Sequence, residues 1–315
     1  MPTFCRHNRF VQNCPICARE QAPARSSASK RAAPARRSAR GGRPRPGDLR
    51  VRHAPRAADD GYANGLVPGL KSSTAARRLA EEIAFSAGRL GVLAAAPPGL
   101  YAEVASEPDV EEATWLAFLI AYLSPLRGED PFASVRAARV PWASDEAPGL
   151  AGVALGPRAA HEPDRGVQTP STYRAWAARA GGQAAAFAGE PSWSAERRFS
   201  RVFERLALPG LHRGARFDLL VTLGRLGRYD VRAGELFLGG DDPVSVAAKR
   251  VFGIADKLLL ERRAAALAEA CEVPLEALDL AFFNWGGDEE RAALGAPPPP
   301  DEDALLEVAG SALLA

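Results

Sequence analysis

The chain has 315 residues, 47% of them hydrophobic and 25% charged, which is the composition of a globular protein. Its net charge of +2 does not by itself point to a nucleic-acid or membrane partner. The first ten residues hold no apolar stretch of a secretory signal, and the longest apolar run, 115–126, is too short to cross a bilayer. Four cysteines do not make a disulfide scaffold at this length, so we expect a cytoplasmic protein without a membrane partner.

Three of the four cysteines and one histidine cluster near the start of the chain, at Cys5, His7, Cys14 and Cys17. Thiolates and an imidazole in a tetrahedral set suit zinc, and four protein ligands leave no open position for a substrate. The spacing therefore predicts a structural zinc knuckle over residues 1–20. A small redox element or an unstructured tail is the alternative.

Residues 21–58 are rich in Pro, Ala, Arg, Ser and Gly and hold almost no large apolar side chains. Such a segment cannot bury enough surface to offset its ordering entropy, so we expect a disordered linker. Its charge is one-sided, because eleven basic residues accompany a single acid, Asp48. This density suits sequence-independent phosphate binding that weakens with salt, although a flexible spacer explains the same composition.

Between residues 61 and 287 the sequence predicts a domain built of successive helices, since strand-forming residues are sparse and no alternating pattern occurs. Residues 140–169 are expected to be irregular. A last acidic, proline-rich stretch, 288–315, is expected to end in one short helix. The predicted fold class is all-α, with helices over 73–93, 111–123, 170–180, 194–206, 215–226, 243–252, 254–271, 274–283 and 304–314.

Residues 208–216, LPGLHRGAR, join an amphipathic helix to the next one through a tight turn that contains glycine. The amides and the dipole at the start of a helix bind phosphate without reading the base sequence. Gly210, His212, Arg213 and Arg216 are therefore candidate DNA contacts. A turn of this kind more often only connects two helices, and these polar side chains would then belong to a solvated helix start.

Two further motifs accompany the turn. About thirty residues later, Asp242 stands at the head of a predicted helix that ends at Gly253, and upstream the apolar helix ends in Leu123-Ser124. In the order and spacing of these motifs, about half of the chain resembles the helix-hairpin-helix DNA glycosylase superfamily. That family has an LPGxG-type hairpin, an aspartate at the head of a later helix, and an early core helix that ends in Leu-Ser.

The resemblance implies duplex DNA as the partner and cleavage of the N-glycosidic bond of an extruded base. Asp242 would stabilise the oxocarbenium-like sugar and orient a water molecule. The resemblance places Tyr122, Ser124 and Arg127 at the base pocket; the alternatives are that Tyr122 is a core side chain and that Arg127 lies in a surface loop. Asp241 is the neighbouring alternative for the catalytic carboxylate, and the alternative interpretation of Asp242 is a plain N-cap of its helix.

Departures from the family pattern narrow this expectation. His212 replaces the second glycine of the hairpin, and Gly214 stands where bifunctional members carry a Schiff-base lysine, so we expect a monofunctional enzyme. Pro125, Leu126 and Arg127 replace the glutamine that often follows Leu-Ser, which favours a modified base over an ordinary repair substrate. No four-cysteine loop follows the last helix, so we expect no iron–sulfur cluster.

The function most consistent with the sequence is thus a monomeric, monofunctional DNA glycosylase acting on a modified base, in base excision or in phage defence. Two alternatives stay open. A narrower likeness to the α-glutamyl/putrescinyl thymine pyrophosphorylases predicts processing of a hypermodified thymine on the same fold. A non-enzymatic DNA-binding protein would use the same hairpin, with Asp242 acting only as a cap.

Overall fold

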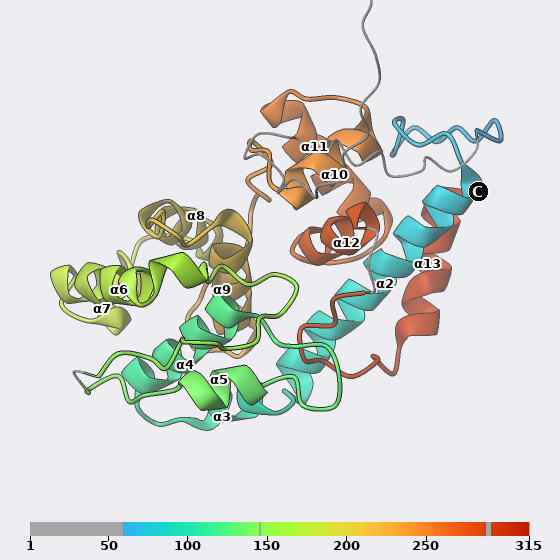
Figure 1. Cartoon of the computed structure of the whole chain (residues 1–315). Helices are drawn as coiled ribbons and strands as arrows, with labels where there is room; N and C mark the ends of the chain where they lie inside the picture. The colour runs from blue at the N-terminus through green and yellow to red at the C-terminus, as the bar shows by residue number, and fades with distance from the viewer. Residues whose placement is uncertain (1–58, 145, 288–290, 315) are drawn as a thin grey trace, which may run out of the picture. The chain divides into compact units, whose positions relative to one another are not determined.

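The computed structural model describes residues 59–144, 146–287 and 291–314 (Figure 1). Within these ranges every regular element is a helix, so the all-α prediction is confirmed. The predicted zinc ligands Cys5, His7, Cys14 and Cys17 and the predicted linker 21–58 lie outside the described residues.

All nine predicted helices occur, with ends displaced by a few residues, and three short helices, α3, α5 and α7, lie where none was predicted. The bounds are α2 (Ser73–Ala95), α3 (Leu100–Ser106), α4 (Val110–Leu123), α5 (Ala133–Ala138), α6 (Gln168–Arg179), α7 (Gln183–Ala188), α8 (Ala195–Arg205), α9 (Arg213–Arg225), α10 (Pro243–Phe252), α11 (Lys257–Ala270), α12 (Ala277–Gly286) and α13 (Glu302–Leu314). A single 3-10 turn, η2 (Pro163–Arg165), interrupts the irregular segment before α6.

Six of the longer helices begin at a side chain that accepts a hydrogen bond from a first-turn amide, which satisfies donors that the helix itself leaves unpaired. These N-caps are Ser72, Asp109, Ser194, His212, Asp242 and Asp256. The three short helices have no such cap. Local capping therefore accounts for most of the helix starts that could be placed from the sequence.

Helix α4 lies in the core, as its apolar sequence predicts, and packs against α3, α5, α7 and α9. Its buried side chains Trp115 and Phe118 stack with Tyr173 of α6, and the rings of Phe118 and Tyr173 have centroids 3.9 Å apart. Burying each of these side chains stabilises the fold by roughly 1.5–3 kcal/mol. This aromatic cluster joins α4 to α6.

Helices α2, α12 and α13 form a second packed group, and α10 lies against α12. Figure 1 shows α2 and α13 side by side. The Trp285 indole N–H donates to the Ala75 carbonyl (2.9 Å), and the Tyr62 hydroxyl donates to the Leu313 carbonyl (2.5 Å). The stretch 288–315, which the sequence sets apart as a tail, thus contributes a helix that packs into the body of the fold.

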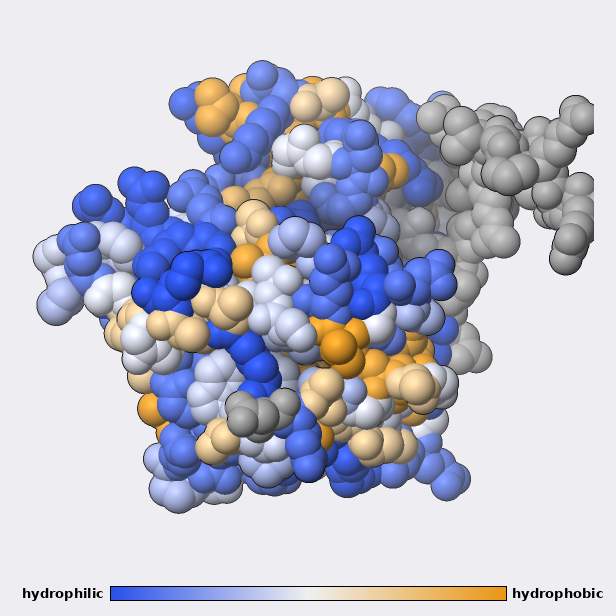
Figure 2. Space-filling model, turned by 60° about the vertical axis from the view of Figure 1, so that its left-hand side comes forward, coloured by the Kyte–Doolittle hydropathy of each residue, from blue (hydrophilic) through white to orange (hydrophobic). Residues whose placement is uncertain are grey.

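On the face drawn in Figure 2, hydrophilic residues cover most of the surface and hydrophobic residues appear in separate groups. No single helix among the described residues is long and apolar enough to cross a membrane. The pair α2 and α3, which meet at 44°, satisfies the length and composition criteria only when the two are taken together.

Candidate functional site

The turn between α8 and α9 depends on Gly210. Its φ is +78°, and a Cβ at this position would lie 2.2 Å from the Thr169 Oγ1 atom. The Thr169 hydroxyl in turn donates to the Pro209 carbonyl at 3.1 Å. Glycine alone fits both the left-handed backbone and the close approach. The structure therefore explains Gly210 as a turn residue, and its contact with DNA stays a prediction.

His212 is the N-cap of α9. Its Nδ1 accepts a hydrogen bond from the Ala215 amide at 3.2 Å, so Nε2 carries the proton and donates to the Ala159 carbonyl at 3.1 Å. The helix begins at Arg213, two residues before the predicted Ala215, because the imidazole of His212 acts as its N-cap. Histidine is not among the usual capping residues, so the sequence did not indicate this start. Among the described residues, the amides of Arg213 and Gly214 donate no hydrogen bond, which leaves two N–H groups at this helix start.

Two of the predicted DNA contacts, Arg213 and Arg216, have partners inside the protein. Arg213, with 8% of its side chain exposed, donates to the Leu236 carbonyl and to the Asp279 carboxylate. Arg216 is half-buried; its Nη1 donates to the Phe203 carbonyl at 3.1 Å and its guanidinium lies 4.3 Å from the centre of the Phe203 ring. Internal partners therefore hold both guanidinium groups, and contact of these two arginines with DNA stays a prediction.

Asp242 is the N-cap of α10, as its structural interpretation predicts. Its Oδ1 accepts from the amides of Val244 (3.2 Å) and Ser245 (3.3 Å), and its Oδ2 accepts from the Ser245 hydroxyl (2.5 Å). Pro243 has no N–H, so the carboxylate satisfies the start of this helix. The side chain nevertheless remains 23% exposed, and its Oδ1 lies 3.7 Å from the Arg213 Nη1 atom. The carboxylate is thus both fixed and accessible.

The neighbouring Asp241 differs sharply from Asp242. Its side chain is 100% exposed, and its charged partner is Lys249, whose Nζ lies 3.4 Å from Oδ1. Exposed pairs of this kind hold a side chain only weakly. Of the two adjacent carboxylates, Asp242 is the one with a defined position.

A buried ionic network lies behind Arg213, and the sequence did not predict it. Arg158, from the irregular segment before η2, donates through Nε to Asp218 of α9 (2.8 Å) and through Nη2 to Asp279 of α12 (2.5 Å). The second oxygen of Asp279 accepts from Arg213. The side chains of Arg158 and Asp279 are each only 2% exposed. Two arginines and two aspartates therefore share one enclosed site.

The two aspartates of this network are not equivalent. Burial alone would raise the pKa of Asp279, but the charges of Arg213 and Arg158 outweigh that effect and leave the pKa below its usual value. For Asp218, burial prevails over the charge of Arg158, and the pKa is raised. Asp279 is therefore the carboxylate that remains charged between the two guanidinium groups.

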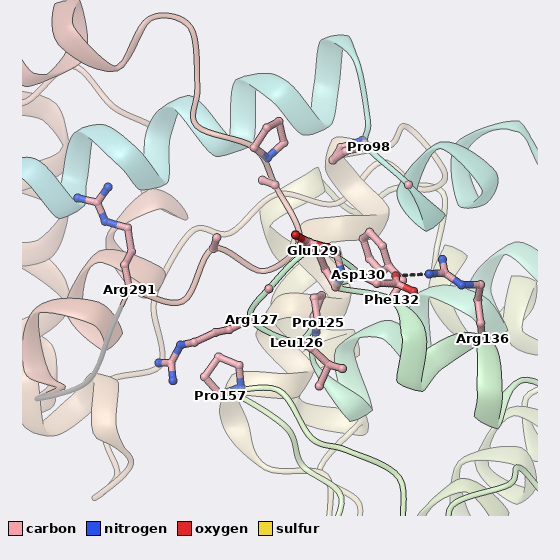
Figure 3. A pocket seen from close by; sticks show the side chains of 17 residues that line it. Pro98, Pro125, Leu126, Arg127, Glu129, Asp130, Phe132, Arg136, Pro157 and Arg291 are labelled. Carbon is pink, nitrogen blue, oxygen red and sulfur yellow. Dashed lines mark hydrogen bonds and ion pairs between the residues drawn. The ribbon is translucent and has the colours of Figure 1, made fainter.

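A pocket of about 690 Å³ opens where the chain leaves α4 (Figure 3). Arg127, predicted at the base pocket, lines it together with Glu129 and Asp130. Arg291, which also pairs with Glu82, is a further lining residue. The volume suits a small organic ligand, and charged groups of both signs surround it.

The other two predicted pocket residues lie elsewhere. Tyr122 is buried, with its hydroxyl 2.9 Å from the His161 Nδ1 atom. Ser124 is 2% exposed, has a φ of +55°, and its hydroxyl oxygen accepts from the Arg158 amide at 3.3 Å. Both side chains thus have internal partners and are not part of the pocket lining, and their place at a base pocket stays a prediction. Pro157 lines the pocket and directly precedes Arg158, so one peptide bond connects the pocket wall to the ionic network.

Within the part of the chain that the structure describes, no group of three or more His, Cys, Asp or Glu side chains is arranged to hold a metal ion. Cys271 is buried and free. Comparisons with protein-family models, with curated proteins and with solved structures found no match to this chain.

Proposed function

We propose that this protein is a monofunctional DNA glycosylase-type hydrolase that extrudes a modified base and cleaves its N-glycosidic bond. The observation that carries the proposal is the state of Asp242. Its carboxylate is held by two amides and a hydroxyl, remains 23% exposed, and faces a buried arginine. A plain cap needs the first of these properties but neither of the other two.

Such a carboxylate suits the chemistry of glycosidic cleavage. As the bond breaks, the departing base takes the bonding electrons and a proton, and the sugar develops positive charge at C1′. A fixed carboxylate stabilises that charge without reorganising and orients a water molecule, whose oxygen adds to C1′ while the proton it loses balances the one that the base takes up. The products are the free base and an abasic site.

The start of α9 supports DNA as the substrate. The amides of Arg213 and Gly214 donate to no described residue, and the side chain of His212 is exposed beside them. A helix start with unpaired amides favours a phosphate, and this kind of contact is independent of base sequence. The pocket lined by Arg127 and Glu129 would take a base that carries polar substituents.

A DNA-binding protein without chemistry is the second candidate, and one observation favours it. The hydrogen bonds of Asp242 account for the start of α10 completely, so capping alone explains its presence. The two candidates differ in one respect only, which is whether the exposed part of the carboxylate does chemistry.

The experiment compares Asp242→Asn with the matched control Asp241→Asn on duplexes that carry a panel of modified bases. Abasic sites are detected by alkaline strand cleavage, and DNA affinity by fluorescence anisotropy. We expect Asp242→Asn to release the base roughly 100-fold more slowly or worse at unchanged DNA affinity, because the amide lacks the negative charge that stabilises the positively charged sugar in the transition state. Asp241→Asn should stay active. DNA binding without base release by the wild type on every duplex would establish the non-enzymatic alternative.

A further inference from the structure

We propose that Asp279 and Arg158 are positioning residues for Asp242: through Arg213, a buried chain of alternating charges holds the carboxylate so that its Oδ2 atom meets the substrate. The chemical part of this inference rests on the proposed function. Its structural part concerns contacts between α9, α10 and α12 and can be tested without any activity.

The chain of contacts begins at Asp279, which bridges two arginines. One of its oxygens accepts from Arg158 at 2.5 Å and the other accepts from Arg213. Asp218 holds the far side of Arg158 at 2.8 Å. Each guanidinium is thus fixed by a carboxylate in an enclosed, low-dielectric site, where charge-assisted hydrogen bonds are strong and directional.

Arg213 transmits this order to the exposed carboxylate. Its Nε donates to the Leu236 carbonyl at 3.0 Å and its Nη2 donates to Asp279, so the plane of the guanidinium cannot rotate. The remaining nitrogen, Nη1, is buried, has no hydrogen-bond partner among the described residues, and lies 3.7 Å from the Asp242 Oδ1 atom. The internal contacts of Arg213 therefore direct its spare N–H groups at Asp242.

The two oxygens of Asp242 consequently have different surroundings. Oδ1 faces three donors, namely the amides of Val244 and Ser245 and the guanidinium of Arg213. Oδ2 accepts only the Ser245 hydroxyl among the described residues, which leaves it a lone pair. The geometry assigns Oδ1 to anchoring and Oδ2 to the reacting sugar and water.

A buried network of this kind is a weak contributor to stability, because the desolvation of its charges offsets much of their attraction. What it provides is a single arrangement of side chains that come from distant parts of the sequence. Arg158 and Asp279 are 121 residues apart, and Arg158 also follows the pocket wall at Pro157. The network therefore fixes the pocket wall and the carboxylate relative to each other.

The test compares Asp279→Asn with Glu276→Gln in the full chain. Glu276 is also a buried carboxylate, at the start of the same helix, but it pairs with Arg225 and does not contact Arg213. We expect Asp279→Asn to lower kcat for base release about 100-fold at unchanged KM, because a small misplacement of a catalytic group has an effect of this size. Glu276→Gln should keep kcat, and Asp279→Glu should recover part of the loss. Should Asp279→Asn fail to fold, Asp218→Asn at the edge of the network should lower kcat in the same way.

A double-mutant cycle tests the contacts themselves. The shift of the urea midpoint caused by Asp279→Asn should depend on whether Asp242→Asn is present, and it should not depend on Asp241→Asn. Coupling between Asp279→Asn and Asp242→Asn in the urea midpoint, without any base release by the wild type, would support the positioning network and reject the proposed chemistry. Two results would overturn the inference. One is that the midpoint shift of Asp279→Asn adds to that of Asp242→Asn just as it adds to that of Asp241→Asn. The other is that Asp279→Asn and Asp218→Asn have a kcat no lower than that of Glu276→Gln.

Discussion

Replacing Gly210 by alanine tests whether the turn between α8 and α9 is built around its contact with Thr169. The new Cβ would lie 2.2 Å from the Thr169 Oγ1 atom and 3.1 Å from the Arg165 Cδ atom, in a backbone with φ of +78°. Gly227, which follows α9, is the matched control, since it has a similar φ of +67° and nothing within 4 Å of its Cβ position.

The expected magnitudes follow from these two environments. Both variants place a side chain in the left-handed region, which costs about 1–2 kcal/mol. In Gly210→Ala the buried Thr169 must also move and lose its hydrogen bond to Pro209, which adds about 1–2 kcal/mol. The free energy of unfolding should therefore fall by about 2–4 kcal/mol in Gly210→Ala and by about 1–2 kcal/mol in Gly227→Ala.

Urea unfolding followed by circular dichroism measures both values, and fluorescence anisotropy measures the DNA affinity of the variants that fold. Gly210→Ala should also weaken DNA binding, because the displaced turn moves the amides of Arg213 and Gly214, whereas Gly227→Ala should not. Equal losses of stability in the two variants would refute the contact with Thr169, and unchanged DNA affinity in Gly210→Ala would refute the role of the turn in binding.

Two further predictions concern stability. Asp242→Ala removes the cap of α10 and should lower the free energy of unfolding by about 1–2 kcal/mol, while Asp242→Asn keeps an acceptor and should cost less; calorimetry showing equal losses would contradict the capping geometry. Burial lowers the pKa of His161, so the unfolded chain takes up this proton at higher pH than the folded chain. Stability should therefore fall as the pH drops below about 6.5, and His161→Asn should reduce this dependence in urea titrations; an unchanged slope would argue against it.

Helices with their capping residues next to them in the chain were predictable. α10 begins at Pro243 as expected, because Asp242 supplies the cap locally. α7 was missed for the opposite reason. The amides of Gln183 and Ala184 at its start donate to Glu111 of α4, more than seventy residues away. No local sequence pattern predicts a helix whose first amides are bonded by a side chain of another helix.

The residues of the candidate site likewise include some that local sequence predicts and some that only distant contacts explain. Asp242 was predictable from the sequence because its hydrogen-bond partners, Val244 and Ser245, are close to it in the chain. Arg158 could not, since its partners Asp218 and Asp279 lie 60 and 121 residues away and the segment that carries it has no regular structure. Arg213 stands at a helix start, where charged side chains usually face solvent, and the carboxylate of Asp279 turns it inward. Charge pairing with residues that are distant in the sequence, rather than local helix propensity, determines the orientation of both arginine side chains.

Asp242 is at the centre of the proposed chemistry, so the most direct test is mass spectrometry of the products that the full chain releases from modified duplex DNA. The wild type and Asp241→Asn should both release a free modified base and leave an abasic site, and Asp242→Asn should release none above background. Equal base release by Asp242→Asn and Asp241→Asn would show that this carboxylate is a helix cap and not the catalytic group.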